Sequence, residues 1–208
     1  MDPIDKTILS ALYAGMLDSS VSAYERLKAR LPVSQEFYES RVAHLSKLGL
    51  VEQSDSSKLT FIGRDALKVV LVGGVFDLIH PGHIHTLKAA KGEGDMLIVV
   101  VARQSTALQI KKNRKIYHSE EQRKELVSSL NFVDLVLIGR EGTLYDTVEY
   151  VKPNVIALGY DQAHREKDVA ENCKKRNLNV HVIRLTTPIP SAKSSKIKEE
   201  LGDSIYGI

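Results

Sequence analysis

The amino-acid sequence predicts an α/β protein whose main domain is a parallel five-stranded sheet with helices on both faces. From residue 68 to about residue 201, short β-branched runs alternate with segments of helical periodicity, a pattern typical of parallel sheets. The length of 208 residues is enough for one complete α/β core and a small second domain. The hydrophobic fraction of 43% and the charged fraction of 26% are ordinary for a globular protein. We therefore divide the chain into domains at residues 1–67 and 68–208.

Residues 1–67 are predicted to begin with three helices. The first starts at Asp2-Pro3, Ser20 and Ser34 are expected to cap the second and third, and Gly49 ends the third. The positions expected to face the core are Ile4, Ile8, Leu9 and Leu12 in the first helix, and Phe37, Val42, Leu45 and Leu48 in the third. Residues 50–53 and 58–62 flank a polar turn and are expected to form a hairpin.

The second domain is predicted from its alternating pattern. Strands are expected over residues 68–74, 94–102, 133–138, 154–158 and 180–185. Helices are expected over residues 82–91, 119–130, 143–151, 162–176 and 191–201. Residues 103–117 are expected to form a polar, basic loop.

The overall charge and the cysteine content limit the class of protein. A net charge of +3 and a pI near 8.8 suit an anionic substrate but do not require nucleic acid. The single Cys173 excludes an intrachain disulfide and a cysteine-based metal cluster. The sequence has neither an apolar run near the roughly 20 residues of a membrane helix nor a signal-peptide pattern, so we expect a cytoplasmic protein without a membrane contact.

Residues 73–83 carry the motif Gly-Gly-Val-Phe-Asp-Leu-Ile-His-Pro-Gly-His, which joins the first expected strand to its helix. In an open α/β sheet ligands bind at this edge, and the free N–H groups at a helix start attract phosphate. His80 and His83 lie at this turn, where imidazoles can donate hydrogen bonds to charge developing on a phosphate. Gly159, Asp161 and Gln162 follow the fourth expected strand, where backbone groups and these two side chains would read a base.

The motif from Gly74 to His83, with Ala90-Lys91 and Gly94-Asp95 before the second strand, resembles the cytidylyltransferase-like nucleotidyltransferases. The resemblance spans nearly all of residues 68–201. It implies a Rossmann-like fold and a single reaction, in which a substrate phosphate attacks the α-phosphorus of a nucleoside triphosphate and pyrophosphate leaves. It also implies Mg²⁺ as a cofactor, bound with the triphosphate, and no protein residue is assigned as a metal ligand.

The resemblance also implies site residues. His80 and His83 would stabilise the transition state at the α-phosphorus, and Lys112 would be the third catalytic residue. The residues expected to contact the nucleotide are Gly74, Val75, Phe76, Asp77, His80, His83, Arg114, Arg123, Gly159, Asp161, Gln162, Ser194 and Ser195. Within this set Asp77 is expected to form a local turn rather than to act in catalysis.

Two substrate pairs remain open on the sequence. Residues 101–103, 119–123 and 158–162 resemble archaeal FAD synthases, which transfer AMP from ATP to FMN. Residues 117–119 and 196–200 instead resemble glycerol-3-phosphate cytidylyltransferase, which would use CTP and a phosphorylated polyol. We favour ATP and FMN because the Asp-Gln pair lies where base or flavin selection should occur.

The order of helices and hairpin in residues 1–67 resembles a winged-helix domain. Such a domain raises a third function, a transcription regulator that senses a nucleotide. Residues 1–67 contain nine acidic and eight basic residues, and the expected recognition helix opens with Glu36 and Glu39, whereas a DNA-binding face is usually basic. We therefore keep DNA as a possible partner that is not favoured. The family resemblance implies a homodimer.

Overall fold

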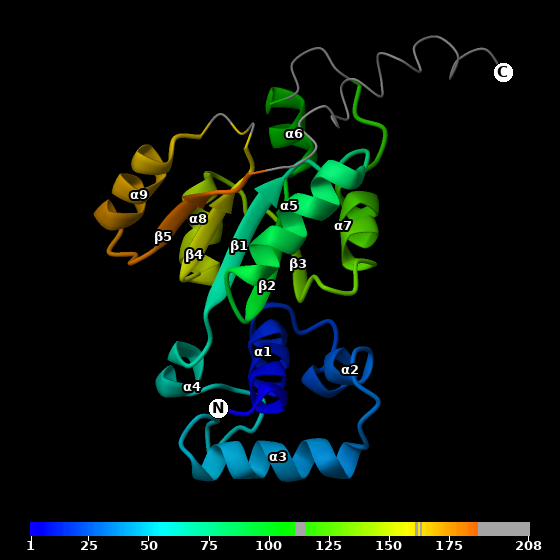
Figure 1. The fold of residues 1–208 in the computed structure, drawn as a ribbon, viewed down its shortest axis with the longest axis vertical. Coiled ribbons are helices and arrows are strands. Elements are labelled where there is room, and N and C mark those ends of the chain that lie inside the picture. Colours follow the sequence, from blue (N-terminus) through cyan, green and yellow to red (C-terminus); the bar gives the residue numbers. More distant parts are fainter. Residues whose placement is uncertain (111–114, 161, 163, 187–208) are drawn as a thin grey trace, which may run out of the picture.

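The computed structural model describes residues 1–110, 115–160, 162 and 164–186. Its centre is a sheet of five parallel strands, as predicted (Figure 1). The strands are β1 (Val69–Gly74), β2 (Met96–Val101), β3 (Leu135–Ile138), β4 (Val155–Leu158) and β5 (His181–Arg184). They lie in the order β3-β2-β1-β4-β5, which confirms the Rossmann-like fold.

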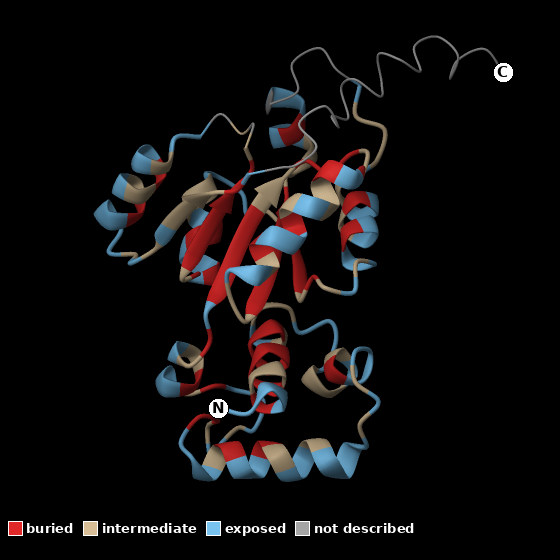
Figure 2. Ribbon diagram, viewed as in Figure 1, coloured by how far each residue is buried: buried red, intermediate tan, exposed pale blue. Residues whose placement is uncertain are grey.

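Helices cover both faces of the sheet, and the alternation of side chains along each strand explains why. Helices α5 (Pro81–Gly92) and α7 (Glu120–Ser128) pack on the face that carries Val70, Val72, Leu97 and Val99. Helices α8 (Leu144–Val151) and α9 (Glu166–Lys175) pack on the face that carries Leu71, Ile98 and Ile156. Because both faces are covered, β1 to β4 are buried along most of their length, whereas the edge strand β5 is only partly buried (Figure 2).

Two predictions in this domain are wrong, one for a loop and one for the start of a helix. Residues 104–110 form helix α6 (Gln104–Ile110), where we predicted only a loop. Helix α9 begins at Glu166, not at residue 162, whose side chain instead donates to the Gly73 carbonyl of β1. The predicted helix over residues 191–201 lies outside the described part of the chain.

The N-terminal domain contains α1 (Pro3–Leu17), α2 (Ala23–Lys28), α3 (Gln35–Lys47) and α4 (Phe61–Asp65). The caps at Asp2 and Ser34 are confirmed, but Ser22 caps α2 in place of Ser20. The predicted hairpin is reduced to one antiparallel bridge between Val51 and Leu59.

Three apolar positions predicted to be buried in this domain are exposed. They are Ile4, Phe37 and Leu48, with 37%, 39% and 57% of their surface accessible. Residues 61 and 62, which were expected in the second strand of the hairpin, belong to α4, because the Thr60 side chain accepts the backbone N–H of Gly63 and starts a helix there. The winged-helix assignment stays a prediction.

The two domains share one hydrophobic core. Leu12 and Tyr13 of α1 belong to the same buried cluster as Val69 of β1 and Val151 of α8. The Tyr13 hydroxyl donates a buried hydrogen bond of 2.8 Å to the Val151 carbonyl. The N-terminal helices therefore lie against the amino-terminal edge of the sheet, below the strands in Figure 1. Within the residues described, no helix combines the length and the apolar character needed to cross a membrane.

Candidate active site

The histidine motif lies at the opposite, carboxyl-terminal edge of the sheet. It follows β1, the central strand, between β2 on one side and β4 on the other. Because the chain winds in opposite directions from β1, the crevice between the ends of β1 and β4 is the topological switch point, where sheets of this kind bind ligands. The fold therefore brings the motif to the expected binding edge.

Gly74 and Phe76 set the shape of the turn after β1. Phe76 has a φ of +54°, a left-handed conformation that is uncommon for a bulky residue, and its ring folds back over Gly74. A Cβ atom on Gly74 would lie 2.7 Å from two atoms of that ring. Only glycine leaves room for the ring, so these two positions of the motif depend on each other.

His80 and His83 face each other at the start of α5. Their rings are stacked, with centroids 3.9 Å apart and an angle of 26° between the planes. The edge of the Phe76 ring meets His83 with centroids 5.3 Å apart. His80 occupies the N-cap position and is buried, and Pro81 begins the helix. Both imidazoles thus lie at the positive end of the helix dipole, which favours an anionic ligand.

Three successive backbone carbonyls at the end of β1 are each held by a different element. The Gly73 carbonyl accepts from Nε2 of Gln162 at 2.7 Å, and the Gly74 carbonyl accepts from the Ala102 amide at 2.9 Å. The Val75 carbonyl accepts from Nη1 of Arg123 at 2.8 Å. The start of the motif is therefore fixed from both neighbouring strands.

Arg123 does not lie where a phosphate could reach it, which corrects our prediction of a nucleotide contact. Its side chain is 0% exposed, and its guanidinium donates to carbonyls of the protein. Burial lowers the pKa of Arg123, while the charges of Asp77, Glu120 and Glu121 oppose that shift. A buried guanidinium whose donors bind protein carbonyls holds the backbone of a loop in place and does not contact a ligand.

Asp77 holds a distant segment, where we predicted a local turn. Its carboxylate accepts the backbone N–H groups of Tyr117 and His118 at 2.9 and 3.0 Å. The Nδ1 of His118 lies 2.7 Å from the Asp77 carbonyl oxygen. In the tautomer that carries its proton on Nδ1, His118 donates a hydrogen bond to that oxygen. Asp77 is therefore part of the framework of the site, and His118 is a supporting residue that we did not predict.

Gln162, which follows β4, reaches across to β1 through its side chain, and base reading by this segment stays a prediction. The Gln162 side chain lies over Gly159, with its Cγ 3.6 Å from where a Cβ of Gly159 would be. Arg184, at the end of β5, supports this loop by donating to the carbonyls of Gly159 and Gln162 at 2.9 and 3.1 Å. It also forms an ion pair with Glu166 at 2.9 Å. We did not predict Arg184, although a lone arginine ending an apolar strand run was a usable signal.

The other predicted site residues are Lys112, Arg114, Asp161, Ser194 and Ser195, and they lie outside the described residues. Those that are described, from Gly74 to His83 with Gly159 and Gln162, lie at one edge of the sheet. In the described ranges no group of three or more His, Cys, Asp and Glu side chains could hold a metal ion.

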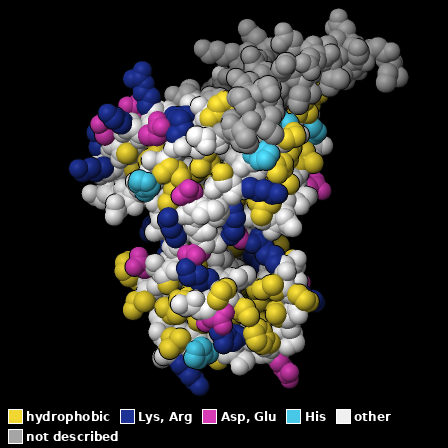
Figure 3. All heavy atoms as spheres, viewed as in Figure 1, with side chains coloured by type: hydrophobic (Ala, Val, Ile, Leu, Met, Phe, Trp, Pro, Cys, Tyr) yellow, Lys and Arg dark blue, Asp and Glu magenta, His cyan; other side chains and the backbone are white. Residues whose placement is uncertain are grey.

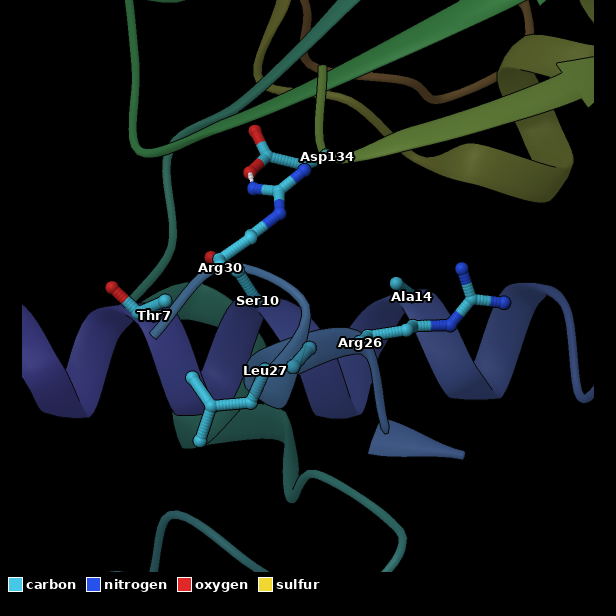
Figure 4. Close-up of a pocket in the computed structure, with 8 residues that line it drawn as sticks. Thr7, Ser10, Ala14, Arg26, Leu27, Arg30 and Asp134 are labelled. Carbon is cyan, nitrogen blue, oxygen red and sulfur yellow. Dashed lines mark hydrogen bonds and ion pairs between the residues drawn. The ribbon is translucent and has the colours of Figure 1, made fainter. Parts of the chain in front are cut away.

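A small cavity elsewhere in the molecule does not compete with this site. It lies between α1, α2 and Asp134 and is lined in part by Ser10, Arg26 and Arg30 (Figure 4). Arg30 reaches out of the N-terminal domain to Asp134 with a short ion pair. The cavity has a volume of about 20 Å³, which is room for one water molecule and not for a nucleotide.

Known proteins resemble this chain over the second domain. The cytidylyltransferase-like family model matches residues 71–200. An FAD synthase of Aciduliprofundum boonei is 46% identical over 116 residues, which are 56% of this chain and 76% of that protein. An FAD synthase of Pyrococcus horikoshii is 43% identical over 143 residues, which are 67% of this chain and 96% of that protein.

A solved structure agrees with these matches. The crystal structure of the lipopolysaccharide core biosynthesis protein from Thermoplasma volcanium is 40% identical and superposes with a TM-score of 0.56 over 58% of this chain and 98% of that one. The sheet order, the histidine turn and the extent of the family match agree with one another. The chain belongs to the cytidylyltransferase-like family.

Proposed function

We propose that this protein is an FMN adenylyltransferase, which transfers AMP from ATP to FMN and releases pyrophosphate. The observation that carries the proposal is the 40–46% identity to archaeal FAD synthases, which reaches 96% of the length of one relative. The site supports it, because a stacked histidine pair at a helix start suits a reaction on a phosphate.

The histidines would act on the α-phosphate of ATP. A phosphate oxygen of FMN attacks the α-phosphorus, a new P–O bond forms, and the bond to the leaving pyrophosphate breaks. Negative charge accumulates on the oxygens around the α-phosphorus in the transition state, and preorganised N–H donors stabilise it. His80 and His83 would supply such donors, and their position at the N-terminus of α5 with stacked rings supports this role.

The divalent metal is proposed to arrive with the triphosphate as MgATP. Mg²⁺ is commonly bound through substrate phosphates and one or two carboxylates, so the phosphate oxygens would supply much of its coordination. When bound, Mg²⁺ would neutralise charge on the leaving pyrophosphate. Lys112, Arg114, Ser194 and Ser195 remain proposed phosphate contacts on the family resemblance alone.

The direct test is pyrophosphate release by the purified full chain with Mg²⁺. ATP with FMN is compared with CTP and glycerol 3-phosphate, and FAD is identified by chromatography. Release with the first pair, together with FAD, supports the proposal. Release with the second pair alone would make the protein a cytidylyltransferase, and release with neither pair would contradict both assignments.

The N-terminal domain gives little support to a DNA-binding function. Glu36 and Glu39 are exposed on α3, and Arg41 of the same helix forms ion pairs with Asp5 of α1 and with its N-cap residue Asp2. On the face drawn in Figure 3, basic and acidic side chains are interspersed over the lower domain. A transcription regulator is therefore not favoured. A homodimer and a cytoplasmic location remain proposals from the sequence.

A further inference from the structure

Arg123 is a buried cation whose hydrogen bonds tie together three segments of the active-site edge. Its Nη1 donates to the carbonyls of Val75 and Ala102, both at 2.8 Å. Its Nε donates to the His118 carbonyl at 3.2 Å, and its Nη2 donates to Oε1 of Gln104 at 3.3 Å. Burying a charge is costly unless it is well hydrogen-bonded, and here the acceptors of the guanidinium come from the loop after β1, from the segment that joins β2 to α6 and from the residue before the N-cap of α7.

The contact with Val75 leads directly to the histidine pair. The Val75 carbonyl belongs to the peptide group that precedes Phe76, so the guanidinium fixes the point at which the backbone takes its positive φ. The Phe76 ring then meets the His83 ring, and the His83 ring stacks on that of His80. A continuous series of contacts therefore runs from Arg123 to both imidazoles.

We infer that Arg123 is a positioning residue for the nucleotidyl transfer, acting on His80 and His83 through the Val75 peptide and the Phe76 ring. This inference rests on the proposed function. Arg123 holds the turn from behind and touches no substrate itself. Lysine cannot replace it, because one ammonium nitrogen cannot take the place of Nη1 at the Val75 and Ala102 carbonyls and also of Nε and Nη2 at their own acceptors.

The test compares Arg123→Lys with Val127→Ala, a matched control one turn along α7. Val127 is also 0% exposed and packs in the hydrophobic core, but its aliphatic side chain offers no hydrogen bond to the Val75 carbonyl. We expect Arg123→Lys to lower kcat about 10- to 100-fold, since small misplacements of catalytic groups have effects of that size. The Kd for ATP should change less than about twofold, because the loss falls on the chemical step. Val127→Ala should lower the Tm and leave kcat unchanged.

A second readout does not depend on catalysis. The imidazole ¹H–¹⁵N signals of His80 and His83 should shift in Arg123→Lys and stay in place in Val127→Ala. If the protein proves inactive with ATP and FMN, these signals still decide whether Arg123 fixes the position of the two imidazole rings. A folded Arg123→Lys variant with unchanged kcat and unchanged histidine signals would overturn the inference.

A third variant covers the case in which Arg123→Lys does not fold. Phe76→Leu removes the ring that connects the Val75 peptide to His83 and leaves Arg123 in place. It should reproduce the fall in kcat and the shift of the His83 signals. Unchanged kcat and signals in Phe76→Leu would show that the proposed series of contacts does not position the histidines.

Discussion

At the scale of single residues, the site depends on a short turn in which each side chain constrains the next. His80 and His83 are three positions apart at the start of α5, which is the spacing that places two side chains on one face of a helix. Their stacking at 3.9 Å leaves both imidazoles at the helix N-terminus, where a phosphate is attracted. We therefore propose that the chemistry depends on this pair.

Replacing either histidine should remove a transition-state donor. We expect His80→Ala or His83→Ala to lower kcat about 10²- to 10³-fold, as the loss of one preorganised donor does in other enzymes. ATP binding, measured by calorimetry, should change little, because the interaction is made mainly in the transition state. His85→Ala, an exposed position of the same helix, is the control and should keep full activity. Normal turnover in His80→Ala and His83→Ala would exclude the mechanism.

Gly74 should tolerate no side chain, whereas its neighbour should. A methyl group at Gly74 would lie 2.7 Å from the Phe76 ring, while at Gly73 nothing lies within 4 Å of the added atom. Gly74→Ala is therefore expected to reduce the free energy of unfolding by about 1–3 kcal/mol, the usual effect of overpacking, and to lower kcat. Denaturant unfolding of both variants checks this. Equal stability of Gly74→Ala and Gly73→Ala would mean that the ring moves without penalty.

At the scale of elements, the loops after β1 and β4 are held by arginines that come from other elements. Arg123 of α7 holds the first loop, and Arg184 of β5 holds the second. Arg184 forms hydrogen bonds that raise its pKa and lower that of Glu166, so the ion pair between them is favoured. The two loops follow adjacent strands, and each is held by its own arginine on either side of the switch point.

Removing the support of the β4 loop should weaken substrate binding more than chemistry. Arg184→Leu removes the donors to the Gly159 and Gln162 carbonyls. We therefore expect the KM for ATP to rise about tenfold, which corresponds to the free energy of roughly one hydrogen bond from a charged donor. kcat should stay within about twofold. Arg176→Leu, which removes an ion pair with Glu149 at the end of α9, is the control. The same KM in both variants would contradict a role for the β4 loop in binding ATP.

At the scale of the whole molecule, the N-terminal domain is joined to the sheet at the edge opposite the site. Tyr13 and Val151 share a buried hydrogen bond, and Lys6 of α1 pairs with Asp95 before β2 at 2.7 Å. The domains are continuous through the hydrophobic core, so we expect them to unfold together. The family match covers residues 71–200, which leaves the N-terminal helices as an addition to the nucleotidyltransferase.

The contact at Asp95 should make stability depend on pH. Burial raises the pKa of Asp95, but hydrogen bonds from Lys6 and from the Lys68 amide, with the charges of Lys6 and Lys91, outweigh it and lower the pKa below its ordinary 3.8. A carboxyl group whose pKa is depressed on folding stabilises the folded state above its unfolded pKa and loses that effect as the pH falls.

Asp95→Asn should therefore reduce the fall in Tm between about pH 5 and pH 3. Asp65→Asn, at an exposed position of α4, serves as the control and should follow the parent protein. Thermal unfolding across this range measures the effect. Parallel Tm curves for Asp95→Asn and the parent protein would show that the carboxylate of Asp95 contributes nothing to the pH dependence.

Local signals predicted some elements well and others badly. The strands of the sheet were predicted from short runs rich in apolar residues, and α7 from the Ser119 cap with Glu120 and Glu121 in the first turn, a cap that the structure confirms. Helix α6 was missed because its sequence shows neither a cap nor an acidic first turn. The start of helix α4 was predicted as a strand because Phe61 and Ile62 are residues that suit a strand. In the structure both are exposed on this short helix.

The sequence by itself determined the parallel sheet, its division into alternating elements and the histidine turn, because these follow from residues a few positions apart. Only the tertiary structure decided what Arg123, Asp77 and Arg184 do. Their partners are backbone groups far along the chain. Arg123 binds the carbonyls of Ala102 and Val75, 21 and 48 residues away. Asp77 binds the amide of Tyr117, 40 residues away, and Arg184 binds the carbonyl of Gly159, 25 residues away. Backbone groups are the same at every position, so the sequence carries no sign of which of them a buried arginine will bind, and only the folded sheet brings them together.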